Sequence, residues 1–223
     1  ILANDASQSR IGALRAVLSN WGGINQAIVN FPGENFGAWY PETFDRVLLD
    51  APCSMENLRP TPDQPMRDTT GDERLRLQER QIQLLKSGLL ALKTGGQLVY
   101  ATCSLAPEED EAVIDAILQQ FPAAIQVEDV RDKIGFDAQG LTTFQGKSFH
   151  PALSKTLRLW PHRTGFSGFF CCLLTKTQSI PTEKDAPPRR DFARTNLEPL
   201  QGDQRHSLNL QLIDQFEFHL EAV

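Results

Sequence analysis

The chain has 223 residues, of which 40% are hydrophobic and 22% charged, a composition typical of a globular protein with a buried core. It contains no run of about 18 apolar residues, so we expect no membrane-spanning segment. The formal net charge of −6 argues mildly against a protein that holds nucleic acid through bulk positive charge, because phosphate contacts need clustered Lys and Arg. We expect a monomer in the cytoplasm.

Strand-like and helix-like patterns alternate along residues 1–176. Strands are expected at residues 1–3, 27–30, 47–49, 98–100, 157–160 and 168–176. Helices are expected at residues 9–20, 73–93 and 107–120. The run Val47-Leu48-Leu49 is continuously apolar, as in a parallel sheet buried on both faces. This order predicts an α/β fold with an open, mostly parallel sheet, whose last two strands run antiparallel to each other.

Three connecting segments carry further expectations. Gly95-Gly96 is expected to cap the long helix before it, and residues 121–156 are expected to be less regular. We interpret the acidic run from Glu108 to Glu111, after Pro107, as a solvated helix start rather than a metal site.

The composition changes near the C-terminus. Prolines and arginines after Gln178 indicate a linker, and residues 207–220 fit an amphipathic helix. We therefore divide the chain into a principal domain, residues 1–177, and a linker with the start of a C-terminal region, residues 178–223.

The cysteines favour a reducing compartment. There are four, Cys53, Cys103, Cys171 and Cys172, too few and too irregularly spaced for a disulfide framework. No CxxC pair is present, so we expect no bound metal and regard a thiol redox protein as a distant alternative.

Polar residues follow the expected strands at their carboxyl ends, where open α/β sheets bind ligands. Asp5, Asp50 and Cys103 occupy such positions. The turn and a nearby helix N-terminus favour ionisation of the Cys103 thiol, whereas the alternative is a small buried hydrophobe. Cys53 has the same two interpretations. If its strand neighbours that of Cys103, both sulfurs face one crevice.

Asp50 ends an apolar strand, where a carboxylate is costly unless it is hydrogen-bonded or functional. The alternative is a cap on the following turn. Pro52 restricts that turn, because it sets its own φ and limits Ala51. A rigid turn beside a carboxylate suits a planar ligand with a polar edge.

The two cysteine segments together match a known family. Asp50-Ala51-Pro52-Cys53-Ser54, followed by Ala101-Thr102-Cys103-Ser104, resembles the paired motifs of the RNA cytosine-5 methyltransferases of the Sun/RsmB and RsmF type. The match includes Ala3-Asn4-Asp5 with Arg10 downstream, and Pro161-His162-Arg163 before the last strand. It covers about residues 1–176. The resemblance implies a Rossmann-like class I methyltransferase sheet, S-adenosylmethionine as cofactor and RNA as substrate.

The resemblance also implies roles for the motif residues. Cys103 is expected to add to carbon 6 of a target cytosine, which makes carbon 5 nucleophilic toward the methyl group. Asp50 is expected to hold the base edge, and Cys53 to assist loss of the carbon-5 proton and release of the RNA. Asp5 is expected to bind the ribose hydroxyls of the cofactor, with Arg10 and Asp50 in the same cofactor site.

RNA contacts are expected at Pro52, Arg59, Arg67 and His162, with the target base out of its stack. For the two arginines the alternative is a pair of solvated loop charges, and for His162 a surface or capping role. Whether the RNA is ribosomal or transfer RNA stays open.

The sequence departs from the family pattern in several places. The family's first strand and glycine-rich loop precede the Ala-Asn-Asp motif, so we expect the chain to be truncated at both ends, with a C-terminal RNA-binding module beyond the linker. Pro32 stands where relatives carry an acid that contacts adenine. Met55-Glu56-Asn57 replaces a Gly-x-Gly pair after the first cysteine motif.

Two other functions are compatible with these residues. In a DNA cytosine methyltransferase the nucleophile is the cysteine after proline, which here is Cys53. An inactive methyltransferase-like module that only binds RNA or a protein partner also fits, because the expected cofactor strand is absent from the sequence.

Overall fold

The computed structural model describes residues 1–23, 25–55, 69–131, 138–188 and 200–216. Its strands are β1 (Leu2–Asn4), β2 (Ala27–Val29), β3 (Phe44–Asp50), β4 (Leu92–Thr102), β5 (Ile125–Glu128), β6 (Thr143–Phe144), β7 (Lys147–Ser148), β8 (Leu157–Leu159) and β9 (Phe169–Lys176). Its α-helices are α1 (Ile11–Asn20), α2 (Phe36–Trp39), α3 (Gly71–Ala91), α4 (Glu111–Gln120), α5 (Pro161–Thr164) and α6 (Gly202–Phe216). Short 3-10 helices span Gln8–Arg10, Gly33–Asn35 and Pro151–Lys155.

The chain divides into two compact units, residues 1–186 and residues 187–223. The second unit contributes α6. The division at residues 177 and 178 into functional domains stays a prediction. Within the described ranges, no helix is both long and apolar enough to cross a membrane.

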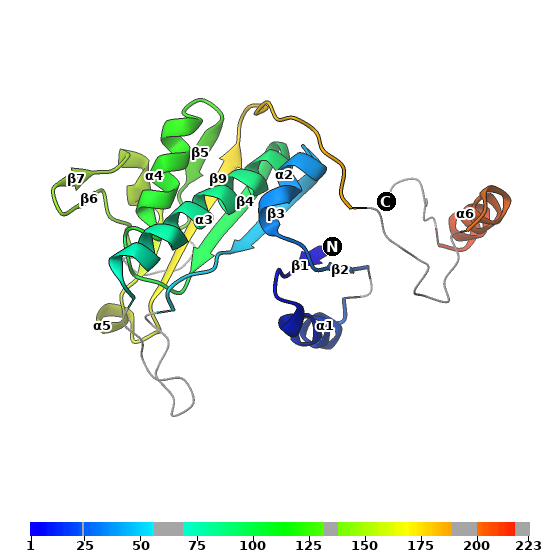
Figure 1. Ribbon diagram of the computed structural model, residues 1–223, viewed down its shortest axis with the longest axis horizontal. Coiled ribbons are helices and arrows are strands. Elements are labelled where there is room, and N and C mark those ends of the chain that lie inside the picture. The colour runs from blue at the N-terminus through cyan, green and yellow to red at the C-terminus, as the bar shows by residue number, and fades with distance from the viewer. Residues whose placement is uncertain (24, 56–68, 132–137, 189–199, 217–223) are drawn as a thin grey trace. The chain divides into compact units, whose positions relative to one another are not determined.

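A five-stranded sheet forms the centre of the first unit (Figure 1). Its order is β3-β4-β9-β5, and β8 also pairs with β9. β3 and β4 are parallel, whereas β9 is antiparallel to β4, β5 and β8. All strands except β9 therefore run in one direction. This confirms the predicted α/β fold and its antiparallel C-terminal strand.

A separate parallel sheet contains β1 and β2, with Leu2 paired to Ala27 and Asn4 to Val29. α1 follows β1 along the chain, as the alternating pattern predicted. Parallel pairing brings the carboxyl ends of both strands to one edge. Asp5 lies directly beyond that edge.

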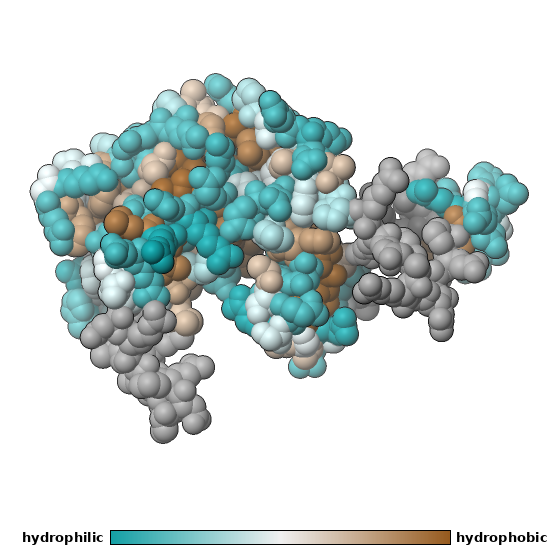
Figure 2. All heavy atoms as spheres, in the orientation of Figure 1, coloured by the Kyte–Doolittle hydropathy of each residue, from teal (hydrophilic) through white to brown (hydrophobic). Residues whose placement is uncertain are grey.

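Apolar side chains of α3 and α4 bury one face of the large sheet. Leu85 and Leu89 of α3 pack into one fully buried cluster with Leu98 of β4 and Ile114 of α4. Thr70 caps the N-terminus of α3, because its hydroxyl accepts a hydrogen bond from the Glu73 N–H. Its outward side is mostly hydrophilic (Figure 2). Amphipathic spacing thus positions the helix against the sheet.

Two regions differ from the sequence-based expectation. Gly95 and Gly96 do not end the helix but lie inside β4, which begins at Leu92 immediately after α3. Gly95 has a φ of +83°, and the β3–β4 register shifts between Phe44 and Arg46, so the glycines form a bulge rather than a cap. Residues 121–156, expected to be irregular, contain β5 and the β6–β7 pair, whose short strands give weak periodicity.

The acidic run after Pro107 is buried, so its interpretation as a solvated helix start is wrong. Glu109, Asp110 and Glu111 are fully inaccessible to solvent, and so is Arg158 of β8. The Arg158 guanidinium donates to Asp110 Oδ2 and to Glu111 Oε1, both at 2.9 Å. A third donation reaches the Leu105 carbonyl oxygen. Burial is tolerated because these charges compensate one another and share hydrogen bonds.

Replacing Arg158 by Met should test this ion cluster. Arg158→Met keeps apolar volume but leaves two buried carboxylates without their cation, which we expect to cost about 3–5 kcal/mol of unfolding free energy. Urea unfolding followed by circular dichroism measures the loss. Arg80→Met is the matched control, because Arg80 pairs with Glu34 while half-exposed, and we expect a cost below about 1 kcal/mol. Equal losses in the two variants would contradict a stabilising cluster.

Candidate active site

Two turns leave the carboxyl edge of the large sheet side by side. β3 and β4 are hydrogen-bonded neighbours, with Asp50 opposite Ala101. The Ala51 N–H donates to the Ala101 carbonyl oxygen at 2.9 Å, which extends the pairing into the first turn. The strands that precede Cys53 and Cys103 are therefore neighbours, which is the condition under which both sulfurs were expected to face one crevice.

The turns bring the two cysteines into contact. The Sγ atoms of Cys53 and Cys103 lie 3.0 Å apart, and both side chains are partly buried. Fifty residues separate them in sequence, so their approach depends on the parallel pairing of β3 with β4. This contact confirms that both sulfurs occupy one site.

The contact shifts the pKa values of the two thiols in opposite directions. A hydrogen bond from the Cys103 thiol, with N–H donors of Met55 and Cys103, lowers the pKa of Cys53 to about 7. The same hydrogen bond, burial and the adjacent charges of Cys53 and Asp50 raise the pKa of Cys103 well above its ordinary value. Of the two interpretations of Cys103, ionisation by its turn is opposed by the neighbouring Cys53, because a second negative charge beside the first is unfavourable. Of the two thiols, Cys53 is therefore the one whose ionised form the site favours.

One buried carboxylate connects the two cysteine turns. The Ser54 N–H donates to Glu109 Oε2 at 2.8 Å, and the Ser104 hydroxyl donates to Glu109 Oε1 at 3.3 Å. Each serine directly follows one cysteine. The two serine hydroxyl oxygens are also 3.3 Å apart. Glu109 thus holds both turns at adjacent points.

Two side chains of helix α3 contact the Glu109 carboxylate. Arg74 forms an ion pair with Glu109 Oε1 at 3.2 Å. The Gln81 side-chain amide donates to Glu109 Oε2 at 3.3 Å and to the Pro52 carbonyl oxygen at 2.8 Å. The predicted substrate residue Pro52 is thereby fixed through its backbone. Rigid support of this kind is what a reactive site needs.

Sequence reasoning missed Glu109, Gln81 and Arg74. Gln81 did give a signal, because it falls between Leu77 and Leu85 in the inward stripe of α3. A polar residue in an apolar stripe requires a buried partner. Glu109 gave none, because nothing local distinguishes a buried acid from a solvated one at a helix start.

The predicted cofactor residue Asp5 follows β1 in the smaller sheet. Arg10 Nε lies 2.9 Å from its Oδ2, and the Ser7 N–H donates to Oδ1 at 2.7 Å. Its carboxylate is 18% exposed. A carboxylate has about four acceptor sites, so Asp5 keeps capacity for a further donor. Arg10 orients Asp5 and is itself largely exposed.

The other predicted residues lie in different places. Asp50 is exposed at the end of β3. His162 lies on α5, in a pocket with Trp160 and Arg163. Arg59 and Arg67 fall outside the described residues, and their predicted contacts with RNA stay untested.

The rate at which iodoacetamide alkylates each cysteine should depend on the fraction of that thiol that is ionised, because only the thiolate reacts. We expect the rate at Cys53 to rise with pH and reach half its maximum near pH 7. Cys103→Ala removes the hydrogen-bond donor, so the midpoint should move up toward about 8.5. Mass spectrometry of the peptides measures each site separately. Cys171 and Cys172, whose pKa values burial raises, serve as internal controls. Preferential alkylation of Cys103 at pH 7 would contradict the assignment.

The chain is similar in sequence to a known protein family and to proteins of named function. The family described as 16S rRNA methyltransferase RsmB/F matches residues 1–175. A ribosomal RNA small subunit methyltransferase F from Erwinia tasmaniensis is 38% identical over 181 residues, which are 81% of this chain and 36% of that protein. A 25S rRNA (cytosine-C(5))-methyltransferase nop2 from Schizosaccharomyces pombe is 37% identical, over 89% of this chain and 33% of its own length.

The fold agrees with that relationship. A crystal structure described as a methyltransferase homolog protein from Pyrococcus horikoshii superimposes with a TM-score of 0.66 at 32% identity, over 79% of this chain and 53% of that chain. The fold is therefore the Rossmann-like fold of class I methyltransferases. The chain spans about a third of the length of the curated relatives that it matches. With a family match over residues 1–175, the chain belongs to the RsmB/F methyltransferase family, as the paired cysteine motifs predicted.

Proposed function

We propose that the protein is an RNA cytosine-5 methyltransferase that uses S-adenosylmethionine and forms a covalent bond between Cys103 and its target base. The observation that carries this proposal is the 3.0 Å contact between the sulfurs of Cys53 and Cys103 at the ends of neighbouring strands. A nucleophile and a proton acceptor in contact are the groups that addition to a cytosine ring requires. The relatives named as ribosomal RNA methyltransferases favour ribosomal RNA as the substrate.

The residues around Asp5 fit the proposed cofactor. Asp5 retains acceptor capacity for ribose hydroxyl groups, and Arg10 with the Ser7 N–H fixes its orientation. Asp50 completes the proposed cofactor residues. When bound, S-adenosylmethionine supplies an electrophilic methyl group on its sulfonium sulfur.

The charge on Cys53 gives that residue two tasks. As Cys103 Sγ bonds to carbon 6 of the base, the Cys103 thiol proton passes to the Cys53 thiolate, and the ring takes the negative charge. A pKa of about 7 then allows Cys53 to release this proton to water and become a base again. After methylation, Cys53 takes the carbon-5 proton while the bond from Cys103 to carbon 6 breaks. The proton next moves from Cys53 to the Cys103 thiolate, which restores the resting pair.

The position of Asp50 supports a role in holding the base. Its exposed carboxylate lies in register with Ala101, two residues before Cys103. A carboxylate there accepts a hydrogen bond from the exocyclic amino group of a cytosine turned out of its stack. The restricted turn at Pro52 limits the movement of the Asp50 carboxylate and of the base edge that it binds.

One observation favours a different assignment of the nucleophile. The low pKa of Cys53 suits direct attack by Cys53, as expected for a DNA cytosine methyltransferase. Because both sulfurs occupy one site, only separate substitution of the cysteines distinguishes the two chemistries.

Separate cysteine variants should reveal which sulfur bonds to RNA. We expect Cys53→Ala to accumulate a covalent protein–RNA adduct, because release needs the Cys53 base, and Cys103→Ala to form none. Denaturing gels with labelled RNA and the cofactor measure the adduct, and thermal unfolding confirms that both variants fold. The reverse pattern, or adducts with DNA alone, would contradict the proposed assignment.

Glu109 should affect chemistry more than RNA binding. Glu109→Gln replaces one acceptor by a donor and breaks a charged hydrogen bond to one cysteine turn, so we expect adduct formation on Cys103 to slow roughly tenfold or more. Rapid-quench kinetics measures the rate, and fluorescence anisotropy should show unchanged RNA affinity. Glu108→Gln is the adjacent control. Equal rates in the two variants would refute the positioning role.

A further inference from the structure

A second strand end lies on the same sheet edge as the cysteines. β4 and β8 flank β9, and Phe170 of β9 pairs with Thr102 on one side and Arg158 on the other. Ser104 and Trp160 each follow two residues later. β4 and β8 run in the same direction, so Trp160 and Ser104 emerge at one level. Two strand spacings separate them, which is about 10 Å.

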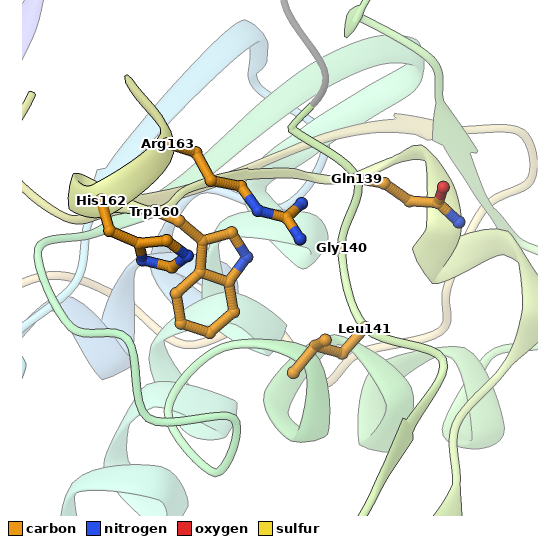
Figure 3. A pocket seen from close by; sticks show the side chains of 6 residues that line it. All are labelled: Gln139, Gly140, Leu141, Trp160, His162 and Arg163. Carbon is orange, nitrogen blue, oxygen red and sulfur yellow. The ribbon is translucent and has the colours of Figure 1, made fainter. Parts of the chain in front are cut away.

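A pocket of about 350 Å³ opens at this strand end. Its walls are Gln139, Gly140, Leu141, Trp160, His162 and Arg163. Trp160, His162 and Arg163 lie on one side, with Leu141 across from them (Figure 3). The volume falls at the lower end of the range for small-molecule sites. The pocket therefore has room for a planar ring beside an aromatic side chain and a cation.

The buried ion cluster fixes both walls of this pocket. The Arg158 guanidinium lies 5.1 Å from the centroid of the Trp160 ring. On the opposite wall, the Leu141 N–H donates to Glu111 Oε1 at 2.8 Å. Glu111 also binds Arg158, so one ion pair orients both sides. Walls that are tied to one buried ion pair hold the pocket in a single shape, as a ligand site requires.

The close packing of Gly140 adds to this rigidity. A Cβ atom at Gly140 would lie 1.9 Å from Thr156 Oγ1 and 2.5 Å from the Leu153 carbonyl oxygen. The Gly140 N–H donates to the Thr156 carbonyl oxygen at 3.0 Å. Only glycine allows this wall to approach so closely, which fixes the position of Leu141.

The chemistry of the walls matches a single-stranded nucleotide. Aromatic side chains stack with any nucleobase, and an arginine guanidinium binds phosphate or a base edge. Trp160 is half-buried, whereas Arg163 is exposed. Because the net charge is −6, RNA binding depends on such local groups rather than on bulk charge.

We propose that this pocket binds a nucleotide next to the target cytosine, with its base stacked on Trp160 and its phosphate bound by Arg163. This inference rests on the proposed function, and it extends the expected RNA contact of His162 to a defined subsite. Trp160 lies about 10 Å along the sheet edge from Ser104, the residue after Cys103. At that distance a neighbouring nucleotide, rather than the target, contacts Trp160. The pocket then contributes to the orientation of the target base over Cys103.

Photo-crosslinking should locate the neighbouring base. RNA oligonucleotides carry one cytosine target and one 5-iodouridine, placed in turn at each position on either side. In the full chain with Cys53→Ala, which traps the target, we expect crosslinks to Trp160 from an immediate neighbour of the target, identified by mass spectrometry. Crosslinks to Trp160 spread evenly over all positions, or absent from every position, would overturn the proposal.

Affinity measurements should separate stacking from charge. Trp160→Ala should weaken RNA binding on the order of 5- to 100-fold, and Trp160→Phe should retain most of the affinity. Arg163→Ala should reduce the slope of log affinity against log salt by about 0.7. Trp21→Ala is the matched control, because Trp21 is 86% exposed, directly follows α1 and is not among the residues that line the pocket. Normal folding and unchanged affinity of Trp160→Ala, together with an unchanged salt slope in Arg163→Ala, would overturn the subsite.

The two proposals fail in different ways. Crosslinks to Trp160 without any adduct on Cys103 would reject the methyltransferase chemistry and keep the subsite. An adduct on Cys103 with no effect of the Trp160 and Arg163 variants would reject the subsite and keep the chemistry.

Discussion

The carboxylate of Glu109 is the contact on which the geometry of the site depends. Backbone pairing of β3 with β4 brings the two turns to one edge, but it ends before either cysteine. Beyond that point, Glu109 binds the Ser54 N–H and the Ser104 hydroxyl, one residue after each sulfur. A buried charge with this many donors has little freedom to move. The sulfur contact follows from that constraint, and the opposite pKa shifts of the two thiols follow from the contact.

Three consecutive acidic residues serve different parts of the edge. Glu109 holds the cysteine turns, Asp110 accepts from the Thr102 hydroxyl at 2.6 Å, and Glu111 binds the Leu141 N–H. Arg158 joins the last two acids and lies against Trp160. One buried network therefore supports both the thiol pair and the neighbouring pocket. The geometry of the thiol pair and the pocket at this sheet edge therefore depends on buried charges rather than on the turns alone.

Local pattern predicted the sheet and the meeting of the cysteines, because apolar runs identify strands and strand ends identify the binding edge. Local pattern did not predict that Glu109 and Glu111 are buried. Their cationic partners Arg74 and Arg158 lie 35 and 47 residues away in sequence. A helix start with four acidic residues has the same local pattern whether or not such partners fold against it. The thiol charge was also unpredictable, since each cysteine's pKa depends on the other at 3.0 Å.

The central claim is that the thiol pair directs methylation to carbon 5 of cytosine in RNA. The most direct measurement uses RNA with tritium at carbon 5 of its cytosines and counts tritium released to water against methyl groups incorporated. The account predicts one tritium released for each methyl group, with release abolished in Cys103→Ala. Methyl incorporation without tritium release would place the methyl group on another atom and contradict the account.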